Sequence, residues 1–210
     1  MNALLVTGGE APPRGRFGPR LSLFSLVCAA DSGLDTLVAW GVEPHLIVGD
    51  MDSVSSLDML KRFPRAELII EPRDKDLTDT ELGLAALAER GAGRIVLAGG
   101  GGGRLDHLLA IRALFERRDR PRPVEWHTAR EAVYLVEEGR SLSLDAERAA
   151  TVSVFPLAEG AEDMTSSGLK WPLRGLGWGP GDCGVSNVAE VGPFEIRAGR
   201  GDLLVVLGGR

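Results

Sequence analysis

The sequence predicts an α/β fold in which an open, mainly parallel sheet is followed by an antiparallel β-sandwich. Three observations predict it. Apolar runs alternate with helix-like segments up to about residue 120, the prolines and charges of DRPRPVEW (119–126) interrupt that alternation, and short strand-like runs fill the remainder. We therefore expect two domains, 1–120 and 121–210.

Apolar runs without polar alternation predict parallel strands that are buried on both faces. These runs are ALLVT (3–7), SLFSLVCAA (22–30), HLIVG (45–49), ELIIE (67–71) and RIVLA (94–98). Helices are expected at 34–41, 78–91 and 104–118, and the second begins with a T-x-x-E capping box made by Thr78 and Glu81. The third offers four leucines for a buried face: Leu105, Leu108, Leu109 and Leu114.

The second domain is predicted from short runs, several of which alternate apolar and polar residues. They lie at 132–139, 140–146, 151–158, 194–199 and 202–209. Three tryptophans are expected to be core residues: Trp40, Trp126 and Trp178. Trp171 stands between Lys170 and Pro172 near polar loops, which suits an exposed edge or an interface.

Charge and cysteine content exclude several classes of protein. The chain of 210 residues has 24 Lys+Arg and 30 Asp+Glu, a net charge of −6, which argues against a nucleic acid or an anionic membrane as the main partner. We see no signal peptide and no apolar stretch that approaches the roughly 20 residues of a membrane span. Cys28 lies in an apolar run, where a free thiol is expected, so we predict a reducing, cytoplasmic location.

Acidic residues follow the predicted strands at the edge where open α/β sheets bind ligands. Asp31 follows one strand, and Asp50 and Asp52 follow the next in GDMDS. Paired carboxylates of this kind suit Mg²⁺, which takes one or two of them together with substrate phosphates. The same aspartates also fit a turn or a helix cap, helped by Ser53.

The charged loop before the second helix strengthens the metal and phosphate interpretation. Lys75 lies among acidic neighbours in EPRDKDLTDTE, and an ammonium beside such a cluster is suited to phosphate binding. The capping box accounts for Glu81 but does not require Asp79, which stays a ligand candidate.

Five glycines, 99–103, precede Arg104, Asp106 and His107. Glycines between a strand and a helix let backbone N–H groups approach phosphate, and Arg104 could complete a phosphate clamp. The run does not match G-x-G-x-x-G, and no G-x-x-x-x-G-K-[ST] occurs, so dinucleotide dehydrogenases and P-loop kinases lose their main support.

Six ordered motifs resemble those of the thiamine pyrophosphokinase family. They are DSGLD, GDMDS, KDLTDTE, GGRLDH, GLKWPL and GVSN, from about Asp31 to Asn187. The resemblance implies an α/β ATP-binding catalytic domain at 1–120 and a β-sandwich thiamine-binding domain at 121–210. Ser32 and Asp35 depart from the family's usual first motif, D-G-G-x-N, and Val188 replaces the glutamate of its usual S-N-E.

The resemblance also implies roles for individual residues. The magnesium and pyrophosphate site would be formed by Asp50, Asp52 and Asp79. The ATP site would include Lys75, Arg104 and Asp106. Trp171, Ser186 and Asn187 would line a thiamine pocket at a homodimer interface that draws on both subunits. The expected binding residues also include Asp31, Ser53 and Thr78.

The reaction implied by this resemblance is transfer of the diphosphoryl group of ATP to the hydroxyethyl oxygen of thiamine, leaving AMP. Mg²⁺ and ATP are the expected cofactor and co-substrate, and Asp50, Asp52, Lys75 and Asp79 the catalytic set. Two alternatives stay open. One is a pyrophosphokinase of the same architecture acting on a pterin alcohol, and the other is a non-catalytic nucleotide or thiamine sensor.

Overall fold

The computed structural model describes residues 1–50, 57–70, 76–146, 149–190 and 192–208, and divides the chain into two compact units, Met1–Ala129 and Arg130–Arg210. The first unit includes β6, which the sequence analysis placed after the junction, because β6 pairs in parallel with β5. Among the described residues, no helix is long and apolar enough to cross a membrane. Both cysteines are free thiols, Cys28 buried and Cys183 exposed.

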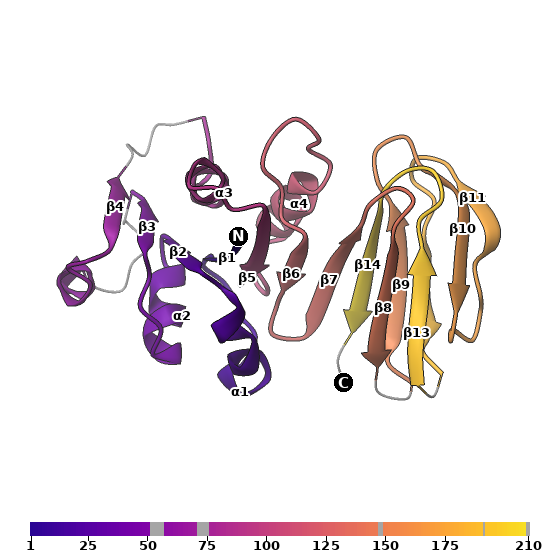
Figure 1. Cartoon of the computed structure of the whole chain (residues 1–210), viewed down its shortest axis with the longest axis horizontal. Coiled ribbons are helices and arrows are strands. Elements are labelled where there is room, and N and C mark those ends of the chain that lie inside the picture. Colours follow the sequence, from indigo (N-terminus) through magenta and orange to yellow (C-terminus); the bar gives the residue numbers. More distant parts are fainter. Residues whose placement is uncertain (51–56, 71–75, 147–148, 191, 209–210) are drawn as a thin grey trace. The chain divides into compact units, whose positions relative to one another are not determined.

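The first unit is a parallel sheet with helices on both faces (Figure 1). Its strands are β1 (Asn2–Val6), β2 (Leu26–Ala30), β3 (Leu46–Gly49), β4 (Glu67–Ile70), β5 (Arg94–Ala98) and β6 (Glu125–His127). They lie in the order β6-β5-β1-β2-β3-β4, and every pair is parallel. The chain therefore winds outward from β1 in both directions, so the switch in strand order lies between β1 and β5, where such sheets bind ligands.

Helices cover the two faces of this sheet in the doubly wound manner. They are α1 (Arg14–Phe17), η1 (Gly18–Leu23), α2 (Gly33–Trp40), η2 (Leu57–Arg62), α3 (Asp79–Glu89) and α4 (Leu105–Leu114). Side chains of α1 and α2, including Phe17, Leu34 and Trp40, form one core cluster with residues of the sheet. The expected strand at 22–30 is shorter, since η1 continues to Leu23 and β2 begins at Leu26.

The predicted buried face of α4 is partly wrong. Leu105 and Leu109 are 68% and 58% exposed, while Leu114 is buried together with Ile111. The buried residues of this helix lie in its second half, and Leu108 in the first half is half-buried.

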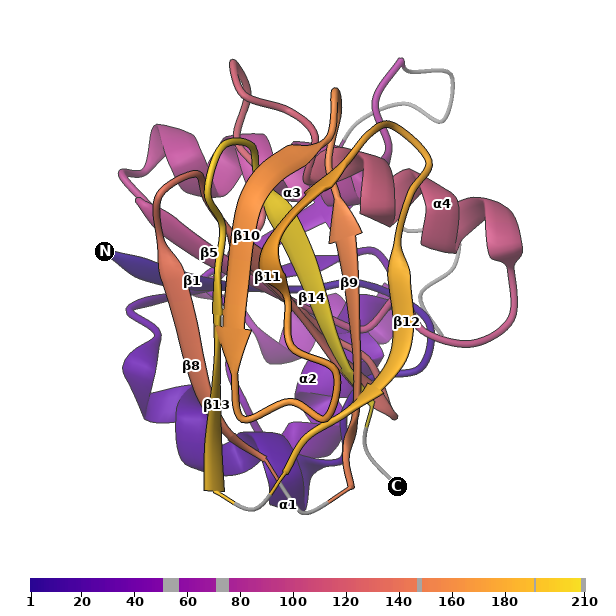
Figure 2. The ribbon, with the colours of Figure 1, turned by 90° about the vertical axis from the view of Figure 1, so that its right-hand side faces the viewer.

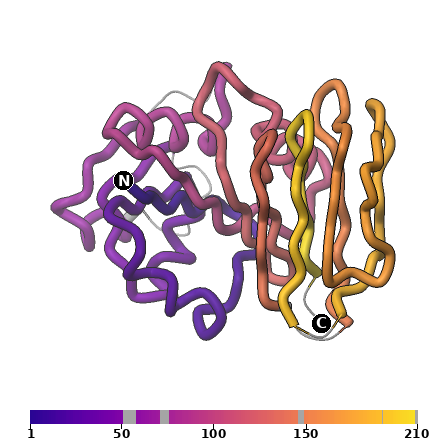
Figure 3. Tube along the Cα trace, turned by 45° about the vertical axis from the view of Figure 1, so that its right-hand side comes forward, coloured from indigo at the N-terminus to yellow at the C-terminus, as the bar shows by residue number. Residues whose placement is uncertain are grey.

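The second unit is an antiparallel sandwich of two four-stranded sheets. Its strands are β7 (Glu131–Val136), β8 (Ser141–Ala146), β9 (Thr151–Pro156), β10 (Ala161–Ser167), β11 (Arg174–Trp178), β12 (Gly184–Val188), β13 (Gly192–Arg197) and β14 (Leu203–Gly208). One sheet has the order β12-β9-β14-β7 and the other β11-β10-β13-β8. Figure 2 looks onto the second sheet, and Figure 3 follows the chain as it runs back and forth through the unit.

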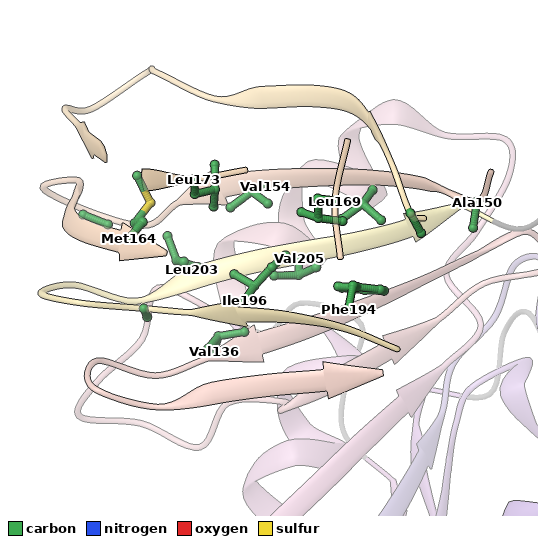
Figure 4. Close-up of a cluster of buried hydrophobic side chains, with 14 residues drawn as sticks. Val136, Ala150, Val154, Met164, Leu169, Leu173, Phe194, Ile196, Leu203 and Val205 are labelled. Atoms are coloured by element: carbon green, nitrogen blue, oxygen red, sulfur yellow. The ribbon is translucent and has the colours of Figure 1, made fainter. Parts of the chain in front are cut away.

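The sandwich core lies between these sheets and is built from apolar side chains of both (Figure 4). Val154, Leu203 and Val205 come from one sheet, and Met164 and Ile196 from the other. β10, β11 and β12 were not predicted from the sequence, because their residues are mostly exposed and show no continuous apolar run. Among the tryptophans expected in a core, Trp40 and Trp126 are buried, and Trp178 packs half-buried against the sandwich core.

Candidate functional site

The carboxyl ends of the parallel strands gather the residues that the sequence analysis selected in the first unit. Thr7 follows β1, Asp31 follows β2, Asp50 follows β3 and Gly99 follows β5. The register pairs Ala30 with Val48 on the adjacent strand, so Asp31 and Asp50 follow neighbouring strand ends. One edge of the sheet therefore presents carboxylates on one side of β1 and a glycine loop on the other.

Asp31 is held in an unusual backbone conformation at the start of α2. Its φ is +48°, in the left-handed region that few non-glycine residues adopt. Its amide donates to Val48 O at 2.9 Å and its carbonyl accepts from Leu34 N at 3.0 Å. Within the same motif, a Cβ on Gly33 would lie 2.0 Å from Val6 O, so α2 can approach β1 this closely only with glycine. One carboxylate oxygen of Asp31 is buried.

The expected metal site is only partly within the described chain. Asp50 is half-buried at the end of β3, whereas Asp52 and Ser53 lie outside the described residues, as does Lys75 in the next loop. Within the described part of the chain, no three His, Cys, Asp or Glu residues converge as metal ligands would. The predicted convergence of Asp50, Asp52 and Asp79 therefore stays a prediction.

The predicted capping box at the start of α3 is confirmed. Thr78 Oγ1 accepts from Glu81 N at 3.3 Å, and Glu81 Oε2 accepts from Thr78 N at 2.8 Å. Asp79 is the first residue of the helix, where a carboxylate also stabilises the helix dipole. Burial opposes ionisation of Glu81, but hydrogen bonds from Arg117 and Thr78 outweigh it and lower the pKa of Glu81. Thr78 and Glu81 thus have structural roles in the free protein.

A buried hydroxyl pair, which the sequence analysis missed, joins this helix to the centre of the sheet. Thr7 Oγ1 and Thr80 Oγ1 lie 2.9 Å apart, and both residues are buried. The pair joins the end of β1 to the first turn of α3 across 73 positions of sequence, so no local motif could reveal it.

The glycine loop is divided into a bonded part and an open part. The amides of Gly99, Gly100 and Gly101 donate to the carbonyls of His127, Gly8 and Glu10 at 3.0, 2.7 and 3.2 Å. Gly99 has a φ of +98°, and a Cβ there would lie 2.1 Å from Thr7 O. Within the described part of the chain, nothing lies within 4 Å of a Cβ added at Gly103. The first three amides of the run thus have partners within the protein, whereas the space beside Gly103 is open among the described residues.

Arg104 and Asp106 follow the loop and form a two-point ion pair on the surface. Arg104 Nη2 lies 2.6 Å from Asp106 Oδ2, and Arg104 Nε lies 3.1 Å from Oδ1. The guanidinium lowers the pKa of Asp106 to about 2, and His107 N also donates to this carboxylate. Both side chains are more than 60% exposed (70% and 63%), so an anionic ligand can compete for Arg104 at little cost.

A buried ionic cluster lies beneath the bonded part of the glycine loop, and the sequence analysis missed it. Glu125 accepts from Arg20 Nη2 at 2.7 Å and also pairs with Arg94. His127 Nε2 lies 2.8 Å from both Glu125 Oε2 and Arg20 Nη1. These hydrogen bonds and charges overcome the effect of burial and lower the pKa of Glu125 to about 2, whereas burial lowers the pKa of His127. The cluster ties η1 to β6, whose His127 carbonyl holds Gly99.

In the second unit, the structure brings together residues that were expected to line the thiamine pocket. The segment Gly168–Trp171 runs antiparallel to Val188–Glu190, with Lys170 N donating to Val188 O and Glu190 N to Gly168 O, both at 2.9 Å. Trp171 is 54% exposed, as predicted, and Lys170 Nζ lies 4.5 Å from the centre of its ring.

Asn187 and Ser186 lie on the strand next to this segment. Asn187 Oδ1 accepts from Trp171 N at 3.1 Å, and Asn187 Nδ2 donates to Trp171 O at 2.6 Å. Ser186 is exposed with a φ of +61°, and its amide donates to Ser153 Oγ at 3.2 Å. Asn187 and Trp171 thus form one surface site on the sandwich, with an indole ring open to solvent, and Ser186 precedes Asn187 on the same strand.

Family comparisons match both units. Residues 20–123 match the model described as thiamin pyrophosphokinase, catalytic domain, and residues 141–200 match thiamin pyrophosphokinase, vitamin B1 binding domain. A curated relative, thiamine pyrophosphokinase of Bacillus subtilis (strain 168), is 27% identical over 153 residues, which is 71% of each chain.

Solved structures resemble the whole chain. The crystal structure of thiamin pyrophosphokinase from Geobacillus thermodenitrificans has a TM-score of 0.79 and 26% identity, and the match covers 100% of this chain and 98% of that one. The structure of the Bacillus subtilis thiamine pyrophosphokinase has a TM-score of 0.81 at 22% identity, covering 100% and 99%, and supports the fold.

Proposed function

This chain belongs to the thiamin pyrophosphokinase family and transfers the diphosphoryl group of ATP to thiamine, and we propose that its first unit holds ATP and its second unit holds thiamine. The observation that carries this conclusion is the pair of domain matches. A catalytic-domain model and a vitamin-B1-binding model match in succession, one within each unit. The proposed division of roles follows the ranges 1–120 and 121–210 predicted from the sequence.

We assign Mg²⁺ binding to Asp50, Asp52 and Asp79. The chemistry of the described edge fits this ion, because Asp31 and Asp50 supply hard oxygen donors at adjacent strand ends. When bound, Mg²⁺ would neutralise charge on the phosphates. Asp31 is fixed by its backbone hydrogen bonds, so it would hold its carboxylate at this edge without rearrangement.

Phosphate binding is assigned to Lys75, Arg104 and the open end of the glycine loop. The amides of Gly99 to Gly101 are already bonded within the protein, so the loop would contact phosphate after Gly101. Arg104 would exchange Asp106 for a phosphate oxygen, and Asp106 would hold the guanidinium in place until ATP arrives. Ser53 and Thr78 complete the residues assigned to this side of the site.

We assign the thiamine pocket to the surface around Trp171, Ser186 and Asn187. The exposed indole of Trp171 offers an aromatic face to a flat aminopyrimidine or a cationic thiazolium. Transfer then requires the hydroxyethyl oxygen to attack the β-phosphorus in line, with AMP leaving. We also propose that a homodimer brings Trp171 of one subunit to the site, because a second copy would cover this exposed ring.

A cytoplasmic location is proposed from the two free cysteines.

The test is to identify the products and the acceptor. Purified protein is incubated with ATP, Mg²⁺ and either thiamine or a pterin alcohol, and nucleotides are separated by chromatography. We expect stoichiometric AMP and thiamine diphosphate when thiamine is the substrate, and no AMP release with the pterin alcohol. ADP as the product would refute diphosphoryl transfer, AMP release only with the pterin alcohol would favour the pterin enzyme, and binding without turnover would favour a sensor.

The metal assignment has its own test in a set of carboxylate variants. Asp50→Asn and Asp52→Asn should each lower kcat by at least about a hundredfold while the protein stays folded, because charge stabilisation by a metal is worth several kcal/mol. Asp58→Asn is the matched control, since Asp58 is exposed and forms an ion pair with Lys61, three residues away. Near-normal turnover in a folded Asp52→Asn protein would contradict the assignment.

A further inference from the structure

The side-chain amide of Asn187 forms hydrogen bonds with the backbone of Trp171. Its Oδ1 accepts from the amide of Trp171 at 3.1 Å and its Nδ2 donates to the carbonyl of the same residue at 2.6 Å. Oδ1 also accepts from Val188 N at 2.8 Å. We propose that Asn187 is a positioning residue. It holds Trp171 in the conformation that receives thiamine, and it does not itself bind thiamine. This inference rests on the proposed role of Trp171 in binding thiamine.

The hydrogen-bonding capacity of the amide supports this role. An asparagine side chain offers two acceptor lone pairs and two N–H donors. Both lone pairs of Asn187 are engaged by Trp171 N and Val188 N, and one N–H is engaged by Trp171 O. An aminopyrimidine presents an N–H donor that needs an acceptor, and Asn187 has no further lone pair to offer it. Oδ1 of Asn187 could therefore accept from the aminopyrimidine only by releasing Trp171 N or Val188 N.

The position of Asn187 explains why a side chain is needed here. The backbone pairing between Gly168–Trp171 and Val188–Glu190 ends with the bond from Lys170 N to Val188 O. Pro172 follows Trp171 and has no N–H to donate. Asn187 continues the pairing by one residue beyond the backbone ladder, and that residue is Trp171. The side chain thereby fixes the peptide groups on both sides of the tryptophan.

Lys170 restrains the ring itself. Its ammonium lies 4.5 Å from the ring centre, within the range of a cation–π contact, so it occupies one face of the indole. The side chain of Trp171 nevertheless stays 54% exposed. With the backbone held by Asn187 and one face held by Lys170, the ring presents a defined surface to a flat ligand, and binding need not restrict its rotation again.

A double-mutant cycle tests the proposal directly. Thiamine dissociation constants are measured by calorimetry for the wild type, Asn187→Ala, Trp171→Ala and the double variant. Asn187→Ala should weaken thiamine binding about fivefold in the wild-type background, the order expected for lost hydrogen bonds. In the Trp171→Ala background it should change binding less than about twofold, because the residue it positions is gone.

Additional measurements separate positioning from general damage. The thiamine KM should rise in Asn187→Ala, while kcat, the ATP KM and the melting temperature stay near wild-type values. Asn187→Asp keeps both acceptor bonds and should recover part of the affinity. Glu190→Ala is the matched control, because this exposed neighbour joins the same pairing through its backbone amide. In the protein without ligand, Asn187→Ala should shift the Trp171 fluorescence, which is isolated by subtracting the spectrum of Trp171→Phe.

Each outcome bears on the proposal. Equal losses from Asn187→Ala in both backgrounds would show that Asn187 contacts thiamine itself and would overturn the inference, while leaving the proposed function intact. Unchanged Trp171 fluorescence in Asn187→Ala would also overturn it, even without any ligand. If Trp171→Ala binds thiamine as well as the wild type does, the proposed thiamine site fails, and this inference fails with it.

Discussion

The two units hold their candidate site residues by different means. In the first unit, the loops at the sheet edge are held from within the core, by close backbone contacts such as Gly99 against Thr7 and by the buried cluster around Glu125. In the second unit, Trp171 is held at the surface by the side chain of Asn187. The sheet edge that supports the ATP side of the proposed site is therefore part of the folding core, and the thiamine side is a local surface feature.

This difference separates stability from function in a testable way. A change that loosens the sheet edge must also disturb buried groups, so folding and activity should fall together. A change at Trp171 removes an exposed ring, so binding should fall while folding stays intact. The following predictions run from the largest expected loss of stability to the smallest.

Gly99→Ala should cause the largest loss of stability. An added Cβ would lie 2.1 Å from Thr7 O, and the φ of +98° is unfavourable for alanine. We expect the free energy of unfolding to fall by about 3 kcal/mol or more, from clash and strain together. Gly103→Ala is the matched control, because its φ is also positive (+68°) but no atom of the described residues lies within 4 Å of the added Cβ. Urea denaturation of both variants measures the difference, and equal losses would contradict a core-held loop.

Glu125→Gln should cause the next largest loss of stability, and Asp106→Asn is the corresponding variant at the surface. Both carboxyls have a pKa of about 2, but Glu125 is 4% exposed whereas the Asp106 side chain is 63% exposed. Removing the buried charge leaves Arg20 and Arg94 without their shared partner, and we expect about 2 kcal/mol of destabilisation, since both arginines keep some solvent. Asp106→Asn should leave the thermal midpoint unchanged. A similar midpoint shift in the two variants would remove the contrast between core and surface.

Acid should destabilise the first unit through the same cluster. The pKa of Glu125 is lowered from 4.5 to about 2, so the unfolded chain binds this proton more readily and the stabilisation is lost as pH falls through that range. His127, whose pKa is also lowered from 6.5, acts in the same direction below about pH 6.5. The wild type should therefore lose stability steadily from pH 7 to pH 3. In Glu125→Gln, denaturation curves should show a shallower slope below pH 4.5, and an unchanged slope would exclude Glu125 as the source.

Trp171→Ala should have the smallest effect on stability and a large effect on binding. The ring is 54% exposed, so its loss should change the unfolding free energy by less than about 0.5 kcal/mol. The thiamine KM should rise about tenfold or more, which corresponds to about 1.4 kcal/mol, with a smaller change for ATP. Steady-state kinetics and a thermal melt on the same sample measure both. A large drop in the melting temperature would mean that the second unit holds this residue as the first unit holds its loops.

The sequence by itself determined the features that depend on spacing along the chain. Buried parallel strands appear as apolar runs because both faces are covered, and the capping box of α3 appears because Thr78 and Glu81 are one helical turn apart. The ordered motifs identified the family, and the position of Asp31 and Asp50 after strands followed from the run lengths. The prediction of an exposed Trp171 also came from its immediate neighbours.

Only the tertiary structure decided which distant residues meet. Arg20 reaches Glu125 because β6 lies beside β5 and η1 covers that face, and Thr7 meets Thr80 because α3 packs above the end of β1. Asn187 meets Trp171 because an irregular segment pairs with the end of β12. These contacts depend on strand order and register, which the chemistry of any single segment does not encode. Glu125, His127 and Thr80 therefore look like ordinary residues in the sequence, while the fold buries them as partners.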